Sequence, residues 1–153
     1  MIRQAIPSDV PALVRNRLAQ QQELYSIDNL DRDDRQRLEE QLFGYFAWAC
    51  TNDNVLFLVD QEDSAIAAVC GFSIEHQPPQ IEDNGEYAYV CDAYTAPRFR
   101  CQGRMGRLVR AGTVEMRKRG VSALYFDSIS KDMIRLCQNL GFKQRHDYYS
   151  LVL

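Results

Sequence analysis

The segment RFRCQGRMGRLVR, residues 98–110, places five arginines and two glycines within thirteen positions, directly after a β-rich run and Pro97. The whole chain has 153 residues and a net charge of -3, so this positive charge is local. Proteins that coat nucleic acid usually carry an overall or one-sided basic excess. The segment therefore indicates a small polyanion as the partner, or a solvated basic helix face, rather than a nucleic acid.

Residues 104–119 follow the glycine-containing turn and predict a helix that ends at Gly120. The first N–H groups of a helix have no intrahelical acceptor, and the helix dipole makes that end a phosphate-binding site. Arg100 and Arg104 are expected to add charge-assisted hydrogen bonds. The phosphate-binding pattern G-x-x-x-x-G-K-[ST] and the dinucleotide pattern G-x-G-x-x-G are both absent.

The rest of the chain predicts an α/β protein. Helical spacing of apolar residues predicts helices at 8–18, in the region 38–49, and at 132–140, besides the one at 104–119. The β-rich runs predict strands, which lie at residues 2–6, 55–60, 66–76, 87–95 and 123–128, with a closing hairpin at 142–145 and 148–153. The order β-α-α-β-β-β-α-β-α-β-β over residues 1–153 predicts one domain with a mixed central sheet of about seven strands and about four helices.

The five cysteines are widely spaced and form no C-x-x-C pair, and the two histidines lie far from them in sequence. This pattern predicts neither a disulfide framework nor a metal site. No apolar run reaches the roughly 18 residues of a membrane span, and the N-terminal segment MIRQAIPSDV lacks the apolar core of a signal peptide. We therefore expect a cytoplasmic protein without a membrane span.

The stretch YTAPRFRCQGRMGRLV, residues 94–109, resembles the acetyl-CoA-binding motif of the GNAT acetyltransferase superfamily. In that motif an arginine or glutamine, two residues, a glycine, one residue, and then a glycine or alanine open a helix. Arg100 and Gly103 match the first two fixed positions. KRGV (118–121) resembles the usual end of the helix, and LCQNLGF (136–142) resembles the closing L-Y-E-x-L-G-F. Because the order of elements is also that of the family, the resemblance covers essentially the whole chain.

The resemblance implies acetyl-CoA as co-substrate, with a splayed strand whose backbone pairs with the pantetheine arm and a loop that wraps the pyrophosphate. The matching residues are Ala93, Tyr94 and Thr95 in the strand and Arg100, Cys101, Gln102, Gly103, Arg104, Met105 and Gly106 in the loop. The implied reaction is direct transfer of acetyl from the thioester to a primary amine of a small molecule or peptide. A base removes the ammonium proton, backbone N–H groups stabilise the oxyanion, and an acid can protonate the departing thiolate.

Two positions depart from the family pattern. Met105 stands where the family prefers glycine or alanine, although its side chain falls on the apolar helix face and Gly106 follows it. Cys137 stands where the family usually has the tyrosine proposed as general acid. Cys137 could be a small core residue, a proton donor with a thiol pKa of about 8.5, or a covalent acyl carrier. Tyr148 and Tyr149 in the closing strand are alternative donors.

The general base has three candidates in the central strands: Glu75, His76 and Asp92. Each residue type is also common at surfaces or in hydrogen-bonded structural positions. Because of the changes at Met105 and Cys137, a non-catalytic acyl-CoA-binding module is the alternative to an N-acetyltransferase. The closing strand at 148–153 offers an edge that a second copy could cover, so a homodimer is also expected to be feasible.

Overall fold

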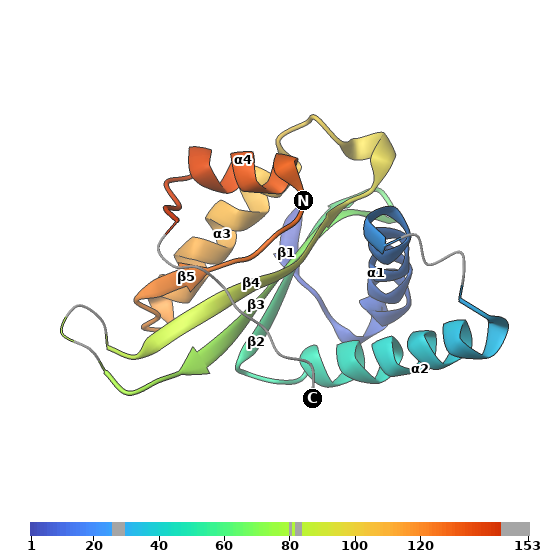
Figure 1. Cartoon of the computed structure of the whole chain (residues 1–153), viewed down its shortest axis with the longest axis horizontal. Helices are drawn as coiled ribbons and strands as arrows, with labels where there is room; N and C mark the ends of the chain where they lie inside the picture. Colours follow the sequence, from blue (N-terminus) through green and yellow to red (C-terminus); the bar gives the residue numbers. More distant parts are fainter. Residues whose placement is uncertain (26–29, 80, 82–83, 145–153) are drawn as a thin grey trace.

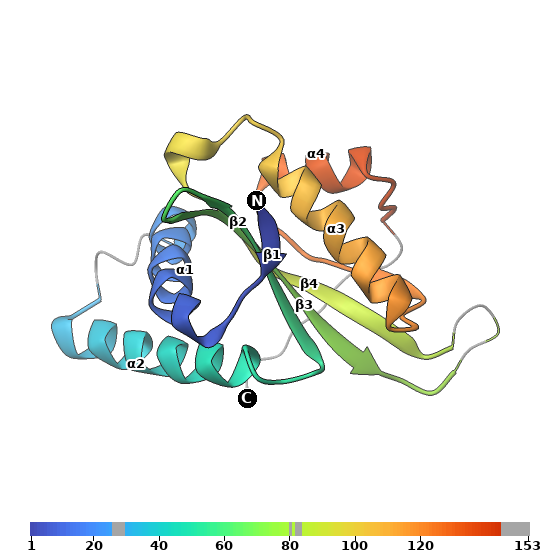
Figure 2. The ribbon, with the colours of Figure 1, turned by 180° about the vertical axis from the view of Figure 1, so that it is seen from behind.

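A computed structural model describes residues 1–25, 30–79, 81 and 84–144. Five strands of this part form one mixed sheet in the order β1 (Ile2–Gln4), β2 (Val55–Glu62), β3 (Ala65–His76), β4 (Glu86–Thr95) and β5 (Ala123–Tyr125). The first three pairings are antiparallel and the β4–β5 pairing is parallel. Helices α1 (Val10–Tyr25) and α2 (Arg32–Ala49) cover one face of the sheet, and α3 (Arg104–Lys118) and α4 (Lys131–Asn139) cover the other (Figures 1 and 2).

The predicted α/β class and the order of elements from β1 to α4 are confirmed. The sheet has five strands in the described part of the chain, where about seven were predicted. Residues 142–144 of the expected closing hairpin are not in a strand, and 145–153, with Tyr148 and Tyr149, lie outside the described residues. The predicted strand 123–128 ends at Tyr125, because only three residues of β4 pair with it.

The first helix begins at Val10, two residues later than the predicted helix at 8–18. A short 3-10 turn at Pro7–Asp9 precedes α1. The carboxylate of Asp9, rather than the Ser8 hydroxyl, accepts from the Ile6 N–H at 2.9 Å and pairs with Arg3 at 2.6 Å. An ionised acceptor makes the stronger hydrogen bond, so the acidic residue takes the capping role.

The two faces of the sheet carry separate apolar clusters. On the α1 and α2 face, Phe46 of α2 meets Phe57 of β2 with ring centroids 5.2 Å apart, and Leu13 of α1 is buried beside them. On the other face, Leu108 and Met116 of α3 pack among the side chains of β3 and β4. The period-2 alternation of the strands and the helical spacing of α3 produce this division.

Strand β4 has unequal neighbours. It pairs with β3 from His76↔Glu86 to Ala68↔Thr95, but with β5 only from Tyr87 to Tyr89. Beyond Tyr89, this side of β4 pairs with no strand in the described part of the chain. The β4–α3–β5 crossover then brings the first turn of α3 next to the end of that open edge (Figure 1).

Two helical glycines provide a matched test of this packing. A Cβ at Gly112 of α3 would overlap the ring of Phe72, whereas one at Gly44 of α2 would meet no atom within 4 Å. Alanine gains up to about 1 kcal/mol of helix propensity at either position. We expect Gly112→Ala to lower the free energy of unfolding by about 1–3 kcal/mol through overpacking. Gly44→Ala should raise it, and urea unfolding of both variants measures the difference. Equal stability of the two variants would contradict the close approach of α3 to β3.

Candidate functional site

Strand β4 contains a β-bulge on its open stretch. Val69 pairs with Tyr94 while Gly71 pairs with Cys91, so β4 has one more residue than β3 between these pairs. Within the bulge Asp92 has a φ of 49°, a left-handed conformation that short polar residues tolerate better than others. The bulge turns the carboxylate of Asp92 towards α1, where it pairs with Arg17.

The Asp92 carboxylate is largely enclosed. Its Oδ1 lies 2.8 Å from Arg17 Nη1, and the two side chains are 13% and 32% exposed. Burial raises the pKa of Asp92 above its usual range, and the charge of Arg17 opposes the rise without cancelling it. A carboxylate with a raised pKa in a partly enclosed site has the character of a general base.

Three polar side chains of α1, spaced three residues apart, contact consecutive residues of β4. We call Arg17, Gln20 and Glu23 the α1 row. Arg17 pairs with Asp92, and Gln20 Nε2 donates to the carbonyl oxygen of Ala93 at 2.9 Å. The carboxylate of Glu23 accepts from the Tyr94 hydroxyl at 2.9 Å and from Arg100 Nη2 at 2.6 Å. The row therefore joins α1 to the part of β4 that the sequence predicts to bind pantetheine.

The loop between β4 and α3 contains two left-handed residues, Cys101 with φ 59° and Gly103 with φ 70°. Gly103 is the N-cap of α3, so the free N–H groups of the first turn belong to Arg104, Met105 and Gly106. Residues 101–103 are exposed. This geometry gives a helix start whose backbone donors can receive an anion.

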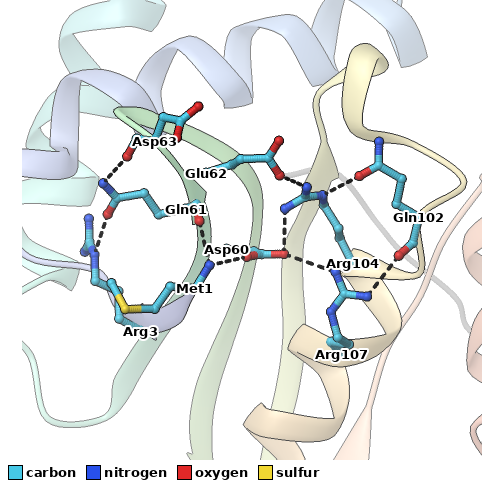
Figure 3. A network of polar contacts seen from close by, with 9 residues as sticks. All are labelled: Met1, Arg3, Asp60, Gln61, Glu62, Asp63, Gln102, Arg104 and Arg107. Carbon is cyan, nitrogen blue, oxygen red and sulfur yellow. Dashed lines mark hydrogen bonds and ion pairs between the residues drawn. The ribbon is translucent and has the colours of Figure 1, made fainter.

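The side chain of Arg104 is only 10% exposed and points to the carboxylates at the end of β2 (Figure 3). Its guanidinium group pairs with Asp60 at 3.1 Å and with Glu62, both at the end of β2, and Nε donates to Gln102 Oε1 at 3.0 Å. It also lies 5.1 Å from the Phe99 ring centroid. The side chain of Arg104 therefore holds the loop to β2. Its backbone N–H belongs to the free donors at the start of α3.

Asp60 is the buried centre of this network. Its side chain is 4% exposed and also pairs with the Met1 amino group at 3.1 Å, and Arg107 Nη2 lies 3.6 Å away. Burial favours a higher pKa for Asp60, but the Met1 ammonium group and Arg104 outweigh burial and hold the pKa below its usual range. The carboxylate is therefore ionised at neutral pH and fixes the two arginines of the α3 start.

The two departures from the family pattern both lie against the core. The Met105 side chain packs on the apolar cluster that contains Leu108 and Met116, as its helical position predicts. At the next residue, Gly106, a Cβ would lie 3.4 Å from the side chain of Leu136 on α4. Cys137 on α4 is 0% exposed, and burial raises the pKa of its thiol to about 11. These positions favour packing roles for both side chains.

Glu75 and His76 lie away from Asp92. They end β3, and Glu75 is four residues beyond Gly71, or about 13 Å along the strand. Glu75 accepts from the Ser73 hydroxyl at 3.0 Å, and His76 pairs with Glu86 at 2.7 Å. Of the three candidate bases, the structure brings Asp92 alone to the α1 row.

Sequence reasoning did not identify the α1 row. Its three members recur at helical spacing, but polar residues at that spacing are also typical of a solvated face. The sequence did not indicate the break in β4 either. The structure shows it, because Cys91 and Tyr94 pack on the same face although they are three residues apart, which regular alternation does not allow.

The GNAT acetyltransferase family model matches residues 20–142. The chain belongs to this family. The comparison with curated proteins gives no match. Among the residues that the structure describes, no three potential metal ligands gather into a cluster, and no helix has the length and apolar character to cross a membrane.

Solved structures share the GNAT fold with this chain at low identity. A predicted acetyltransferase from Clostridium acetobutylicum, with acetyl-CoA, is 21% identical with a TM-score of 0.83, over 99% of this chain and 95% of that one. A GCN5-related N-acetyltransferase from Ralstonia eutropha is 16% identical with a TM-score of 0.81, over 99% and 97%. Glucosamine-6-phosphate N-acetyltransferase from Arabidopsis thaliana is 18% identical with a TM-score of 0.74, over 99% and 97%.

Replacing Arg104 tests the network at the start of α3. Arg104→Met would leave the buried Asp60 with less compensation, so we expect a loss of about 3 kcal/mol in the free energy of unfolding at pH 7. The pKa of Asp60 is lowered in the folded state, so its pairing stabilises the protein above the ordinary carboxyl pKa of about 4. This stabilisation is lost as the pH falls through the lowered pKa.

The gap in stability between wild type and Arg104→Met should therefore narrow in acid, as measured by denaturant unfolding between pH 7 and pH 3. Arg110→Met, at an exposed position of the same helix, is the control. It should change stability by no more than about 0.5 kcal/mol. A loss at Arg110 as large as that at Arg104 would show that the overall charge of α3, rather than the buried pair, determines the effect.

Proposed function

We propose that the protein is an acetyl-CoA-dependent N-acetyltransferase in which Asp92 is the general base. The observation that carries this proposal is the open edge of β4, which has a half-buried carboxylate in its bulge and leads to the free N–H groups of α3. An extended thioester arm and a diphosphate match the two parts of this surface. Membership of the GNAT family supports acetyl-CoA as the donor.

The donor would lie along Ala93, Tyr94 and Thr95 and end at the loop from Arg100 to Gly106. Two carbonyls of this strand already accept from side chains: Ala93 from Gln20 and Thr95 from Arg100 Nε, both at 2.9 Å. A carbonyl oxygen has two lone pairs, so pantetheine would pair with these carbonyls beside the side-chain donors. Because Arg104 is held by Asp60 and Glu62, the diphosphate would depend mainly on backbone N–H groups.

Asp92 would take a proton from the acceptor ammonium group, which frees the nitrogen lone pair. The nitrogen then forms a bond to the acetyl carbon while the carbon–sulfur bond breaks. Coenzyme A leaves as a thiolate and takes up one proton. The nitrogen loses its second proton to solvent as the amide forms, and the proton on Asp92 also passes to solvent. The acceptor is a primary amine of a small molecule or peptide. The burial of Cys137 favours solvent as the source of the thiolate proton.

Asparagine at position 92 keeps a short polar side chain that tolerates the left-handed backbone. We expect Asp92→Asn to bind acetyl-CoA with unchanged affinity and to lower kcat by about 10²–10⁴-fold, because the general base is lost. Calorimetry measures binding, and release of free thiol with a panel of amines measures turnover. Glu75→Gln separates the two carboxylate candidates. A large loss of kcat in Glu75→Gln, with little loss in Asp92→Asn, would contradict the assignment of Asp92 as the general base.

A non-catalytic acyl-CoA-binding module is the second candidate, favoured by the side chain of Met105 at a position where the family prefers glycine or alanine. The same two measurements separate the candidates. A module would bind acetyl-CoA with no thiol release on any amine, and Asp92→Asn would change neither property.

Two glycines at opposite ends of α3 test the diphosphate site. Gly103 and Gly120 have φ of 70° and 83°, and a Cβ at either would find open space or, at Gly103, an atom of Arg107 at 3.6 Å. Alanine strains either backbone by about 1–2 kcal/mol, but only the Gly103 end carries the free N–H groups. We expect Gly103→Ala to raise the KM for acetyl-CoA about tenfold, the equivalent of 1.4 kcal/mol.

The KM for S-acetylpantetheine, which lacks the diphosphate, should stay the same in Gly103→Ala. Gly120→Ala should leave both KM values at the wild-type level while losing comparable stability. If Gly103→Ala weakened both donors equally, the loop would not be the diphosphate site.

A further inference from the structure

The contacts of the α1 row with Asp92 and Ala93 close into a ring. Arg17 Nη1 lies 2.8 Å from Asp92 Oδ1 and donates to Gln20 Oε1 at 2.5 Å. Gln20 Nε2 in turn donates to the carbonyl of Ala93, the next residue of β4, at 2.9 Å. The covalent bond between Asp92 and Ala93 completes the ring, so one arginine fixes both the carboxylate and the adjacent peptide.

The groups that face Asp92 come from four elements. Arg17 reaches it from α1, Tyr45 approaches from α2, Cys70 lies in β3, and Cys91 precedes it in β4. Burial raises the pKa of Tyr45, Cys70 and Cys91, so these three groups are neutral at physiological pH. Among the described residues, Arg17 is therefore the cation that balances the charge of this carboxylate.

A carboxyl group with little exposure and no counter-ion takes up a proton rather than remain charged. A protonated carboxyl cannot accept the proton of an ammonium group. The orientation of the Asp92 side chain also depends on Arg17, because the left-handed bulge alone leaves this side chain free to rotate about χ1. The ion pair removes this freedom, and Gln20 holds the arginine from its other side.

The following inference rests on the proposed function. We propose that Arg17 is a positioning residue of the acetyl transfer, because it keeps the Asp92 carboxylate ionised and directed at the acceptor amine beside β4. Arg17 itself touches neither substrate. Gln20 assists by fixing the guanidinium group relative to the Ala93 peptide.

The test compares Arg17→Met, Arg17→Lys and Arg15→Met. Methionine keeps much of the apolar stem and removes the charge, and lysine restores the charge without the guanidinium fork. Arg15 lies on the same helix, is exposed, and forms no ion pair with another described residue, so it controls for the charge of α1.

The readout is the pH profile of kcat/KM for the best amine of the panel. In Arg17→Met the acid limb should move to higher pH by about one unit or more, because an opposite charge within ion-pair distance lowers a carboxyl pKa by roughly that amount. The loss of kcat/KM should accordingly be about tenfold or greater on that limb and shrink at alkaline pH. Arg17→Lys should recover part of the shift, and Arg15→Met should follow wild type.

A second readout does not need turnover. The carboxyl carbon of Asp92 can be followed by ¹³C NMR in the free protein, and its titration should move upward in Arg17→Met to the same extent as the acid limb. In the Asp92→Asn background, Arg17→Met should cause no further change in the pH profile.

The two possible failures look different. If Asp92→Asn lost activity while Arg17→Met kept the wild-type acid limb and the wild-type Asp92 titration, the role of Arg17 would be refuted and the base assignment would stand. If Asp92→Asn kept full activity, or no amine were acetylated, the proposed function itself would fail, and with it the role of Arg17. A drop in kcat/KM that is equal at every pH would indicate a structural effect only and would also overturn the proposal.

Discussion

Strand β4 has a neighbour along one side and, for half its length, none along the other in the described part of the chain. Backbone N–H and C=O groups need partners, and an edge that ends inside a fold leaves them available. The β4–α3–β5 crossover places the unpaired N–H groups of a helix start at the end of that edge. The site follows from this one arrangement, because the bulge, the α1 row and the loop all lie along the open stretch.

Five nearby arginines suggest a loop with a strongly positive surface, but carboxylates neutralise two of them. Arg104 is committed to Asp60 and Glu62, and Arg100 is held by Glu23 and the Thr95 carbonyl. Buried and half-buried carboxylates thus neutralise side chains beside a surface that we assign to an anion. The arginines shape the loop, and the peptide dipoles, which need no counter-charge, face outward.

The sequence alone predicted the elements from β1 to α4 and the loop because these depend on local patterns. Apolar spacing, Gly120 after α3 and the order of strands and helices gave the α/β class, and the loop motif gave the family. The pairs that build the proposed acid–base site were not predictable in this way. Arg17 and Asp92 are far apart in the chain, and no local pattern indicates that one should contact the other. Nor does the composition of the basic segment reveal that Asp60 would bury one of its arginines.

Position 92 needs a residue that tolerates a left-handed backbone, and the proposed base needs a carboxylate at the same position. A longer glutamate would strain the bulge, whereas glycine or asparagine would keep the backbone and remove the carboxylate. A switch of the proposed base from aspartate to glutamate would therefore require the bulge to be rebuilt at the same time.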